Sequence, residues 1–156
     1  MRYLGIDPGL QITGYGVLDV TGVKPLLVDA GVIRLTAKQP IPKRLVELEA
    51  ELVSLIDEAK PEAIAVEQLY AHYKHPRTAI LMGHARGVIL LAAARKNIRL
   101  IEISANRIKK NLTGFGHASK LQMQRGVQDL FRLKTLPQPP DVADAIAIAL
   151  CAARGD

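Results

Sequence analysis

The segments RYLGIDPG, residues 2–9, and TGYGVLDV, residues 13–20, open the chain and decide its fold class. The first predicts a short apolar strand that stops at Asp7-Pro8-Gly9, because proline and glycine end a strand and allow a tight turn. Residues 13–20 and 25–35 predict two further strands. Turn signals separate all three, which indicates an antiparallel meander.

Helices and buried strands alternate in the rest of the chain. Apolar residues at three- and four-residue spacing between Leu45 and Ala59 predict a helix that Pro61 ends. Later elements are expected as strands at 63–68 and 98–103 and helices at 78–96, about 105–112, 119–133 and 141–153. Ser104 is the expected N-cap of the helix at about 105–112, and Ser119 with Gln122 forms a capping box for the helix at 119–133. This order predicts an α/β fold, a mixed sheet with helices on its faces, in one domain over residues 1–156.

The composition narrows the class of protein. The chain has 156 residues, of which 49% are hydrophobic and 23% charged, as in soluble globular proteins. Its single cysteine, Cys151, excludes an internal disulfide and favours a cytoplasmic location. No apolar run reaches about 18 residues, which argues against a membrane span, and no leader-like segment opens the chain. The net charge of +6 fits either a polyanion-binding surface or an ordinary solvated one.

Four carboxylates stand in apolar surroundings, where an unpartnered charge is costly. Asp7 ends the first strand, Glu67 ends the buried strand at 63–68, and Asp141 and Asp144 lie three apart on the last helix. Singly, each has a structural explanation: a turn former, a strand end facing water, or acids that stabilise a helix N-terminus.

Together, the four acids predict a cation site in a surface that is otherwise basic. Repulsion among nearby carboxylates favours a bound cation, and oxygen-only ligation favours Mg²⁺ or Mn²⁺ over zinc. Two such ions about 4 Å apart activate a water and stabilise a leaving oxygen in phosphodiester hydrolysis. Basic residues outnumber acidic ones outside the constellation, as expected of a nuclease that holds phosphates along its rim.

Several blocks of the sequence resemble the RuvC family of Holliday-junction resolvases. The matching blocks are Gly5-Ile6-Asp7-Pro8-Gly9, Thr13-Gly14-Tyr15-Gly16, Val66-Glu67-Gln68, Ala85-Arg86-Gly87-Val88 and Asp141-Val142-Ala143-Asp144-Ala145. The resemblance covers essentially the whole chain. It implies a ribonuclease H-like fold with a central mixed five-stranded sheet, a homodimer, and Mg²⁺-dependent symmetric nicking of a four-way DNA junction in recombination and repair.

The resemblance also assigns roles to residues. Asp7, Glu67, Asp141 and Asp144 would be catalytic ligands of two Mg²⁺ ions per site, with Mn²⁺ as a substitute. Some relatives carry histidine where this chain has Asp141, so the ligand set here is all carboxylate. A motor of the RuvA and RuvB type is implied as a partner in branch migration.

Basic and aromatic residues carry over as DNA contacts. Tyr70 would stack on bases near the junction centre, since stacking needs only a π-face; the alternative is a half-buried loop tyrosine. Lys109 and Lys120 match basic residues near the scissile phosphate, and Lys120 would offset charge in the transition state. Lys74 and Arg77 form a basic loop placed to contact the DNA backbone.

The helix at 78–96 carries Gly83 and Gly87 one turn apart. Close packing within the monomer explains these glycines, whereas the resemblance points to this helix as the dimer contact.

Three other functions fit parts of the pattern. A junction-binding protein without catalysis would share the basic surface but need none of the four acids. A nucleotide-binding protein of the actin and sugar-kinase superfamily also opens with an Asp-Gly phosphate turn, but needs a second domain and a second phosphate loop. Another ribonuclease H-like nuclease would carry the same acids and cut a different DNA or RNA.

Overall fold

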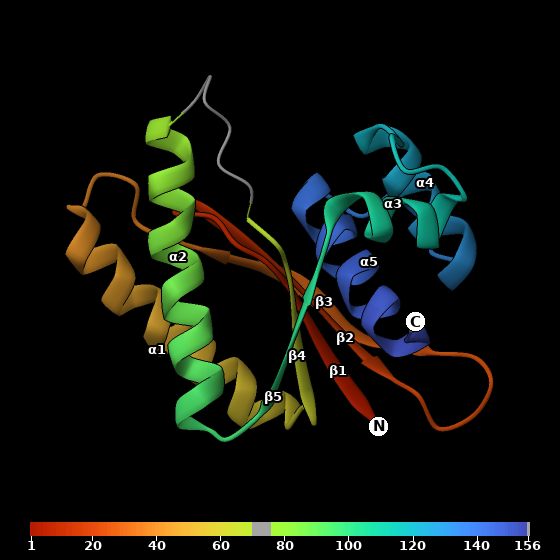
Figure 1. Cartoon of the computed structure of the whole chain (residues 1–156), viewed down its shortest axis with the longest axis horizontal. Helices are drawn as coiled ribbons and strands as arrows, with labels where there is room; N and C mark the ends of the chain where they lie inside the picture. The colour runs from red at the N-terminus through yellow and green to blue at the C-terminus, as the bar shows by residue number, and fades with distance from the viewer. Residues whose placement is uncertain (70–75, 156) are drawn as a thin grey trace.

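The computed structural model describes residues 1–69 and 76–155 and contains a sheet covered by helices on both faces (Figure 1). Its elements are β1 (Arg2–Asp7), β2 (Ile12–Asp19), β3 (Leu26–Arg34), α1 (Ile41–Ala59), β4 (Ala63–Glu67), α2 (Pro76–Arg95), β5 (Arg99–Ile103), α3 (Ala105–Thr113), α4 (Lys120–Phe131) and α5 (Pro140–Arg154). The predicted order of strands and helices is confirmed.

The sheet is mixed and has β1 at its centre. The strand order is β3-β2-β1-β4-β5, with antiparallel pairing among β1, β2 and β3 and parallel pairing of β1 with β4 and of β4 with β5. The predicted meander and the five-stranded mixed sheet are therefore confirmed. In the parallel β1–β4 pair Ile6 lies opposite Val66, so the next residues, Asp7 and Glu67, end neighbouring strands at the same edge of the sheet.

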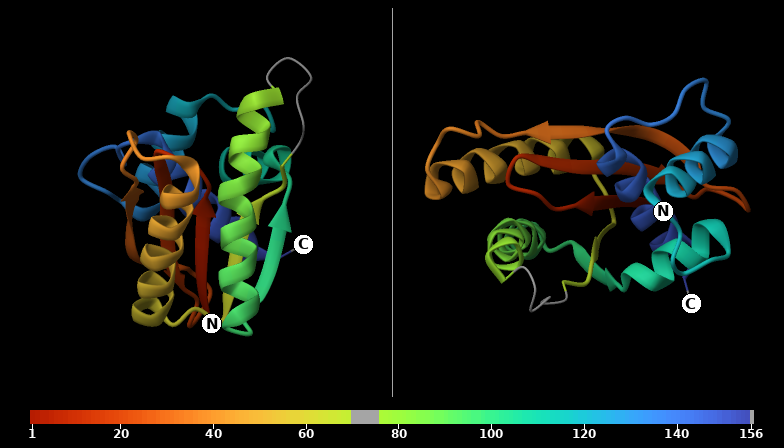
Figure 2. Two further views of the ribbon diagram at one scale, coloured as in Figure 1. Left: turned by 90° about the vertical axis from the view of Figure 1, so that its left-hand side faces the viewer. Right: turned by 90° about the horizontal axis from the view of Figure 1, so that it is seen from above.

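Helices divide between the two faces of the sheet. Figures 1 and 2 show α1 and α2 on one face and α3, α4 and α5 on the other. On the first face Leu48 and Leu52 of α1 pack with Leu4 and Ile6 of β1, and all four are fully buried. Because helices cover both faces, β1 and β4 are apolar at successive positions, as a strand buried on both sides requires.

Glycines in β1 and β2 let α5 lie directly on the sheet. A methyl group built at Gly5 would lie 2.2 Å from the carbonyl oxygen of Ala145, and one at Gly14 would lie 2.2 Å from the carbonyl oxygen of Asp141. No real side chain tolerates such distances, so only glycine fits at these two positions. Glycine within a strand commonly marks such a close backbone approach.

Local signals set the helix ends, with two corrections to the predictions. The helix expected from Thr78 begins at Pro76, because proline is well suited to the first turn, and Arg77 therefore belongs to α2 rather than to a loop. Ser104 occupies the N-cap of α3 but makes no capping hydrogen bond through its side chain. The capping box of Ser119 and Gln122 is confirmed at the start of α4.

Helix α2 is long and apolar, yet most of its residues are not buried. Within the described residues it is the one helix long and apolar enough, by length and composition alone, to cross a membrane. Only 22% of its apolar stretch is buried in the described structure, where α2 packs against α1 and β5.

Candidate active site

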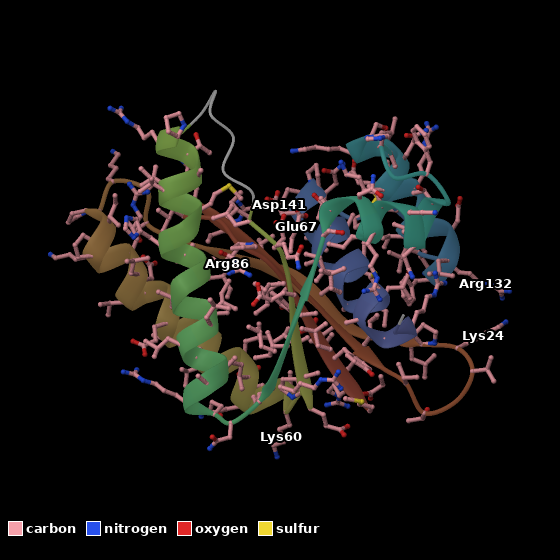
Figure 3. The ribbon with its side chains drawn as sticks, viewed as in Figure 1. Lys24, Lys60, Glu67, Arg86, Arg132 and Asp141 are labelled. Atoms are coloured by element: carbon pink, nitrogen blue, oxygen red, sulfur yellow. The ribbon has the colours of Figure 1, made fainter. Side chains whose placement is uncertain are left out.

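The four predicted acids converge at one edge of the sheet. Asp7 and Glu67 end the adjacent parallel strands β1 and β4. The backbone of Asp141 lies against Gly14, which is the residue opposite Asp7 in the β1–β2 pair. In the view of Figure 3, the labelled Glu67 at the end of β4 and Asp141 at the start of α5 appear side by side.

Helix α5 supplies the other two acids from its N-terminal end. Asp141 lies in the first turn, where the helix dipole favours a negative charge. Asp144 follows one turn later on the same side of the helix. Both side chains are half-buried, whereas the rest of α5 is almost entirely buried. The close approach of α5 to Gly14 thus brings these carboxylates to the end of β1.

The electrostatics of the site follow from this crowding. Burial raises the pKa of Asp7 well above its usual range, and the charges of Asp144, Asp141 and Glu67 raise it further. Burial likewise raises the pKa of Glu67 and of Asp144, and each of these carboxylates feels at least one other acid of the group. The four acids therefore share one electrostatic environment that favours a compensating positive charge.

Two lysines, one on α3 and one on α4, lie beside the acids. Lys109 of α3 and Lys120 of α4 line a hollow of about 160 Å³ together with Glu67 and Asp144. The charge of Lys120 lowers the pKa of Asp7 and of Asp144, and that of Lys109 lowers the pKa of Glu67 and of Asp144. The lysines thus offset the repulsion only in part.

The backbone of Lys120 is fixed by its surroundings. It is the first residue of α4 and lies between Ser119 and Gln122, the two residues of the capping box. In the preceding loop, the amide of Phe115 donates to the hydroxyl of Thr113 at 3.1 Å. The exposed side chain of Lys120 therefore extends from a helix end that hydrogen bonds hold in place.

The donor set fits hard divalent cations. All four candidate ligands are carboxylates, and oxygen is the ligand that Mg²⁺ and Mn²⁺ prefer. Within residues 1–69 and 76–155, no three acidic, histidine or cysteine side chains lie close enough to hold one ion by themselves. A Mg²⁺ ion usually takes only one or two protein carboxylates and completes its shell with water and substrate phosphate. Pairs of carboxylates beside an open hollow match that requirement.

The predicted DNA contacts are only partly described. Tyr70 and Lys74 lie outside the described residues. Arg77 is exposed in the first turn of α2.

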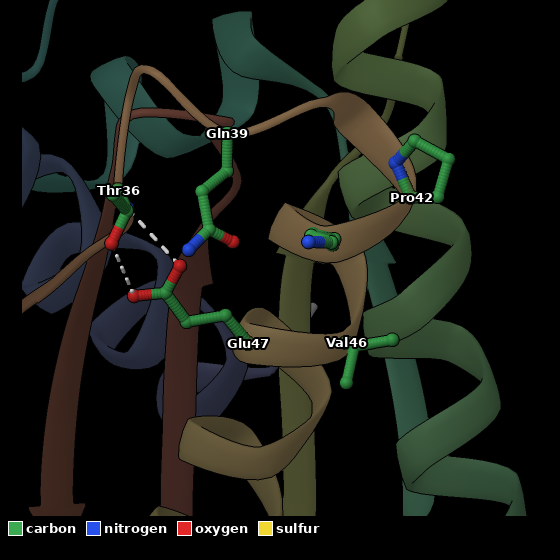
Figure 4. Close-up of a pocket in the computed structure, with 6 residues that line it drawn as sticks. Thr36, Gln39, Pro42, Val46 and Glu47 are labelled. Atoms are coloured by element: carbon green, nitrogen blue, oxygen red, sulfur yellow. Dashed lines mark hydrogen bonds between the residues drawn. The ribbon is translucent and has the colours of Figure 1, made fainter.

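A larger hollow elsewhere lacks this chemistry. It has a volume of about 460 Å³ and lies between α1 and the segment that precedes it, lined by Thr36, Gln39, Pro42, Lys43, Val46 and Glu47 (Figure 4). Its carboxylate, on Glu47, accepts hydrogen bonds from the amide and the hydroxyl of Thr36 at 3.1 and 3.2 Å. The converging acids, rather than the larger hollow, mark the functional site.

Comparison with known proteins identifies the family. The family model described as crossover junction endodeoxyribonuclease RuvC matches residues 3–152. The chain belongs to the RuvC family. A RuvC crossover junction endodeoxyribonuclease of Rhodopirellula baltica is 47% identical over 148 residues, covering 95% of this chain and 83% of the relative. That of Thermosipho melanesiensis is 43% identical over 153 residues, covering 98% and 97%.

Solved structures agree with this membership. Thermus thermophilus RuvC in complex with a Holliday junction substrate is 33% identical to this chain, with a TM-score of 0.89 and coverage of 98% of this chain and 93% of that one. The yeast mitochondrial Holliday junction resolvase Ydc2, at 17% identity and a TM-score of 0.70, shares the fold. The predicted ribonuclease H-like class is thereby confirmed.

The sequence did not predict how three residues of the matching blocks shape this RuvC-family site. Gly5 and Gly14 admit α5 to the sheet, and their signal was glycine inside a predicted strand. Arg86 of α2 reaches the end of β4, where its Nε donates to the carbonyl oxygen of Glu67 at 3.3 Å. Nothing in the spacing of the sequence indicates that contact, because the two residues are nineteen positions apart on different elements.

Proposed function

We propose that this chain is a structure-selective endonuclease that resolves four-way DNA junctions by nicking two strands symmetrically, in recombination and repair. The observation that supports it most is the convergence of four carboxylates on one edge of the sheet, in a chain whose family match spans residues 3–152. A purely structural junction-binding protein would have no use for buried acids whose charges oppose one another.

Asp7, Glu67, Asp141 and Asp144 are proposed to hold two Mg²⁺ ions, with Mn²⁺ as a substitute. Asp7 is central, since the other three acids all act on its pKa. We assign one ion to Asp7 with an acid of the Asp141 and Asp144 pair, and the other to Asp7 with Glu67. When bound, the ions supply an activated water and stabilisation of the leaving oxygen.

The two lysines are proposed to hold the scissile phosphate over the acids. Lys109 and Lys120 line the hollow opposite Glu67 and Asp144, so a phosphodiester entering it would meet positive charge on that side. Lys120 would also offset negative charge that develops in the transition state, because a preorganised cation acts strongly in a partly dry site. Tyr70 is proposed to stack on bases near the junction centre, and Lys74 and Arg77 to contact the DNA backbone.

A homodimer is proposed to form through the exposed stripe of α2. Ile80, His84, Gly87, Leu91 and Ala94 recur at alternating spacings of four and three and are all exposed. This spacing is that of a helix–helix seam. A two-fold dimer would present two sites to a junction with near two-fold symmetry.

The wider setting is also a proposal. The 156 residues are proposed to act as a single nuclease domain in the cytoplasm, beside a branch-migration motor of the RuvA and RuvB type. The basic surface and the family membership support this setting.

The decisive experiment neutralises Asp7. Asp7→Asn should bind a synthetic four-way junction as the wild type does, yet cut it with Mg²⁺ at least about 100-fold more slowly, because it removes the shared ligand. Asp57→Asn is the matched control, since Asp57 is exposed on α1 and pairs with Lys96. Normal cleavage by Asp7→Asn would overturn the metal site.

A second measurement separates the alternatives in substrate. The wild type should cut the four-way junction in preference to a linear duplex or an RNA–DNA hybrid. Equal cutting of all three would point to another ribonuclease H-like nuclease.

A further inference from the structure

The two arginines in the second half of α2 have very different surroundings. The side chain of Arg86 is only 13% exposed, whereas that of Arg95, two and a half turns further on, is 63% exposed. Each forms an ion pair with a glutamate of a neighbouring element: Arg86 with Glu102 of β5 and Arg95 with Glu49 of α1. A mostly buried guanidinium is costly unless its donors are well used, so the contacts of Arg86 require an explanation.

Arg86 ties together the ends of β4 and β5. Its Nε donates to the backbone carbonyl of Glu67 at 3.3 Å, while its Nη2 pairs with the carboxylate of Glu102. Glu102 lies opposite Val66 in the parallel β4–β5 ladder, one residue before the position opposite Glu67. In Figure 3 Arg86 extends from α2 toward β4, below Glu67.

The contact falls on the last peptide of β4 that the sheet holds. Glu67 is the last residue of β4, and the following amide, that of Gln68, donates to the carbonyl of Ile103 at 2.8 Å. The carbonyl of Glu67 belongs to the same planar peptide as that amide, so Arg86 holds the carbonyl side of a peptide whose N–H side is bound to β5. Holding both sides of this peptide fixes the direction in which the Glu67 side chain leaves the backbone, toward the hollow that it lines with Asp144.

We infer that Arg86 is a positioning residue that fixes the end of β4, so that the carboxylate of Glu67 faces the other acids. This inference rests on the proposed metal site. Arginine suits the task because its planar fork donates in two directions at once, to the Glu67 carbonyl and to Glu102. Lysine keeps the charge but lacks the fork.

The test measures Mn²⁺ binding to the protein in the absence of DNA, alongside the Mg²⁺ dependence of junction cleavage. Arg86→Gln should weaken Mn²⁺ binding by about 10- to 100-fold, the usual effect of removing a group that orients a metal ligand. Arg86→Lys should recover part of that loss, and Glu102→Gln should cause a smaller loss in the same direction. The matched control Arg95→Gln removes the other ion pair of α2 and should leave Mn²⁺ affinity unchanged.

The outcomes separate the inference from the proposed function. If the wild type and Glu67→Gln bind Mn²⁺ equally, the metal site itself is wrong. If Glu67→Gln loses binding while Arg86→Gln retains wild-type affinity, only the role of Arg86 is overturned. Should Arg86→Gln fail to fold, as judged by circular dichroism, Glu102→Gln decides: unchanged affinity in this variant overturns the inference, and a selective loss supports it.

Discussion

Helices α5 and α2 are both rich in apolar residues, yet the fold treats them differently. Ten of the fifteen residues of α5 are buried, whereas only four of the twenty residues of α2 are. Helix α5 lies between the sheet and helices α3 and α4, while α2 packs against α1 and β5 and leaves one stripe exposed (Figures 1 and 2). Hydrophobicity alone therefore does not tell which helix completes the monomer and which remains available to another molecule.

The two helices also bring opposite charges to the same edge of the sheet. Helix α5 places Asp141 and Asp144 beside Asp7, and α2 places Arg86 behind Glu67. The buried helix thus carries candidate metal ligands, while the more exposed helix carries the group that contacts a ligand's backbone.

Substitution in the close packing of α5 on the sheet should have the largest effect on the free energy of unfolding. Gly5→Ala should lower the free energy of unfolding by about 3 kcal/mol or more, because the added methyl group would meet the backbone of Ala145 and Ala149 at 2.2 and 2.5 Å. Urea unfolding followed by circular dichroism measures this loss.

A glycine on α2 provides the matched control for Gly5. A methyl group at Gly83, outside the exposed stripe, would lie 3.7 Å from Cδ2 of Leu69, which is an ordinary contact, so Gly83→Ala should raise the free energy of unfolding by up to about 1 kcal/mol through helix propensity. Equal effects of the two substitutions would show that the difference between the helices is not one of packing.

The exposed stripe of α2 should control self-association. Leu91 is 45% exposed, and Leu91→Glu should weaken the proposed dimer by at least about 10-fold, because it places a charge in an apolar seam. Analytical ultracentrifugation measures the dissociation constant. Leu130→Glu is the control, since Leu130 is 42% exposed on α4, which lies on the other face of the sheet. An unchanged dimer in Leu91→Glu would exclude this face.

The cluster of acids around Asp7 should make the metal-free protein less stable as pH rises. Burial and the neighbouring acids raise the pKa of Asp7, so the folded state binds its proton more tightly than the unfolded chain does. The resulting stability is fully present below the unfolded pKa of Asp7 and is lost as pH rises through the folded pKa.

Asp7→Asn tests this pH dependence directly. In the absence of metal at pH 8, the variant should be more stable than the wild type by about 1–2 kcal/mol, and the difference should disappear near pH 3. Urea midpoints across pH measure it, and Mg²⁺ should stabilise the wild type alone. A variant less stable than the wild type at pH 8 would contradict a strained acid cluster.

Local sequence patterns predicted the strands and helices and the place of each of the four carboxylates on them. Apolar runs that end in Asp7 and Glu67 indicated carboxylates at strand ends, and the three-residue spacing of Asp141 and Asp144 put them on one side of a helix. The roles of Lys109 and Lys120 came from family resemblance, because lysines on a helix have no distinctive pattern of their own. Tyr70 and Lys74 stay predictions.

The sequence by itself determined which segments form strands and helices, with the start of α2 displaced by two residues, since periodicity, proline, glycine and caps act over a few residues. Only the tertiary structure decided that β1 lies between β2 and β4, that Gly14 receives the start of α5, and that Arg86 reaches Glu67. These contacts join residues far apart in the chain. They depend on which faces pack together, and that choice is made by the whole core rather than by any local segment.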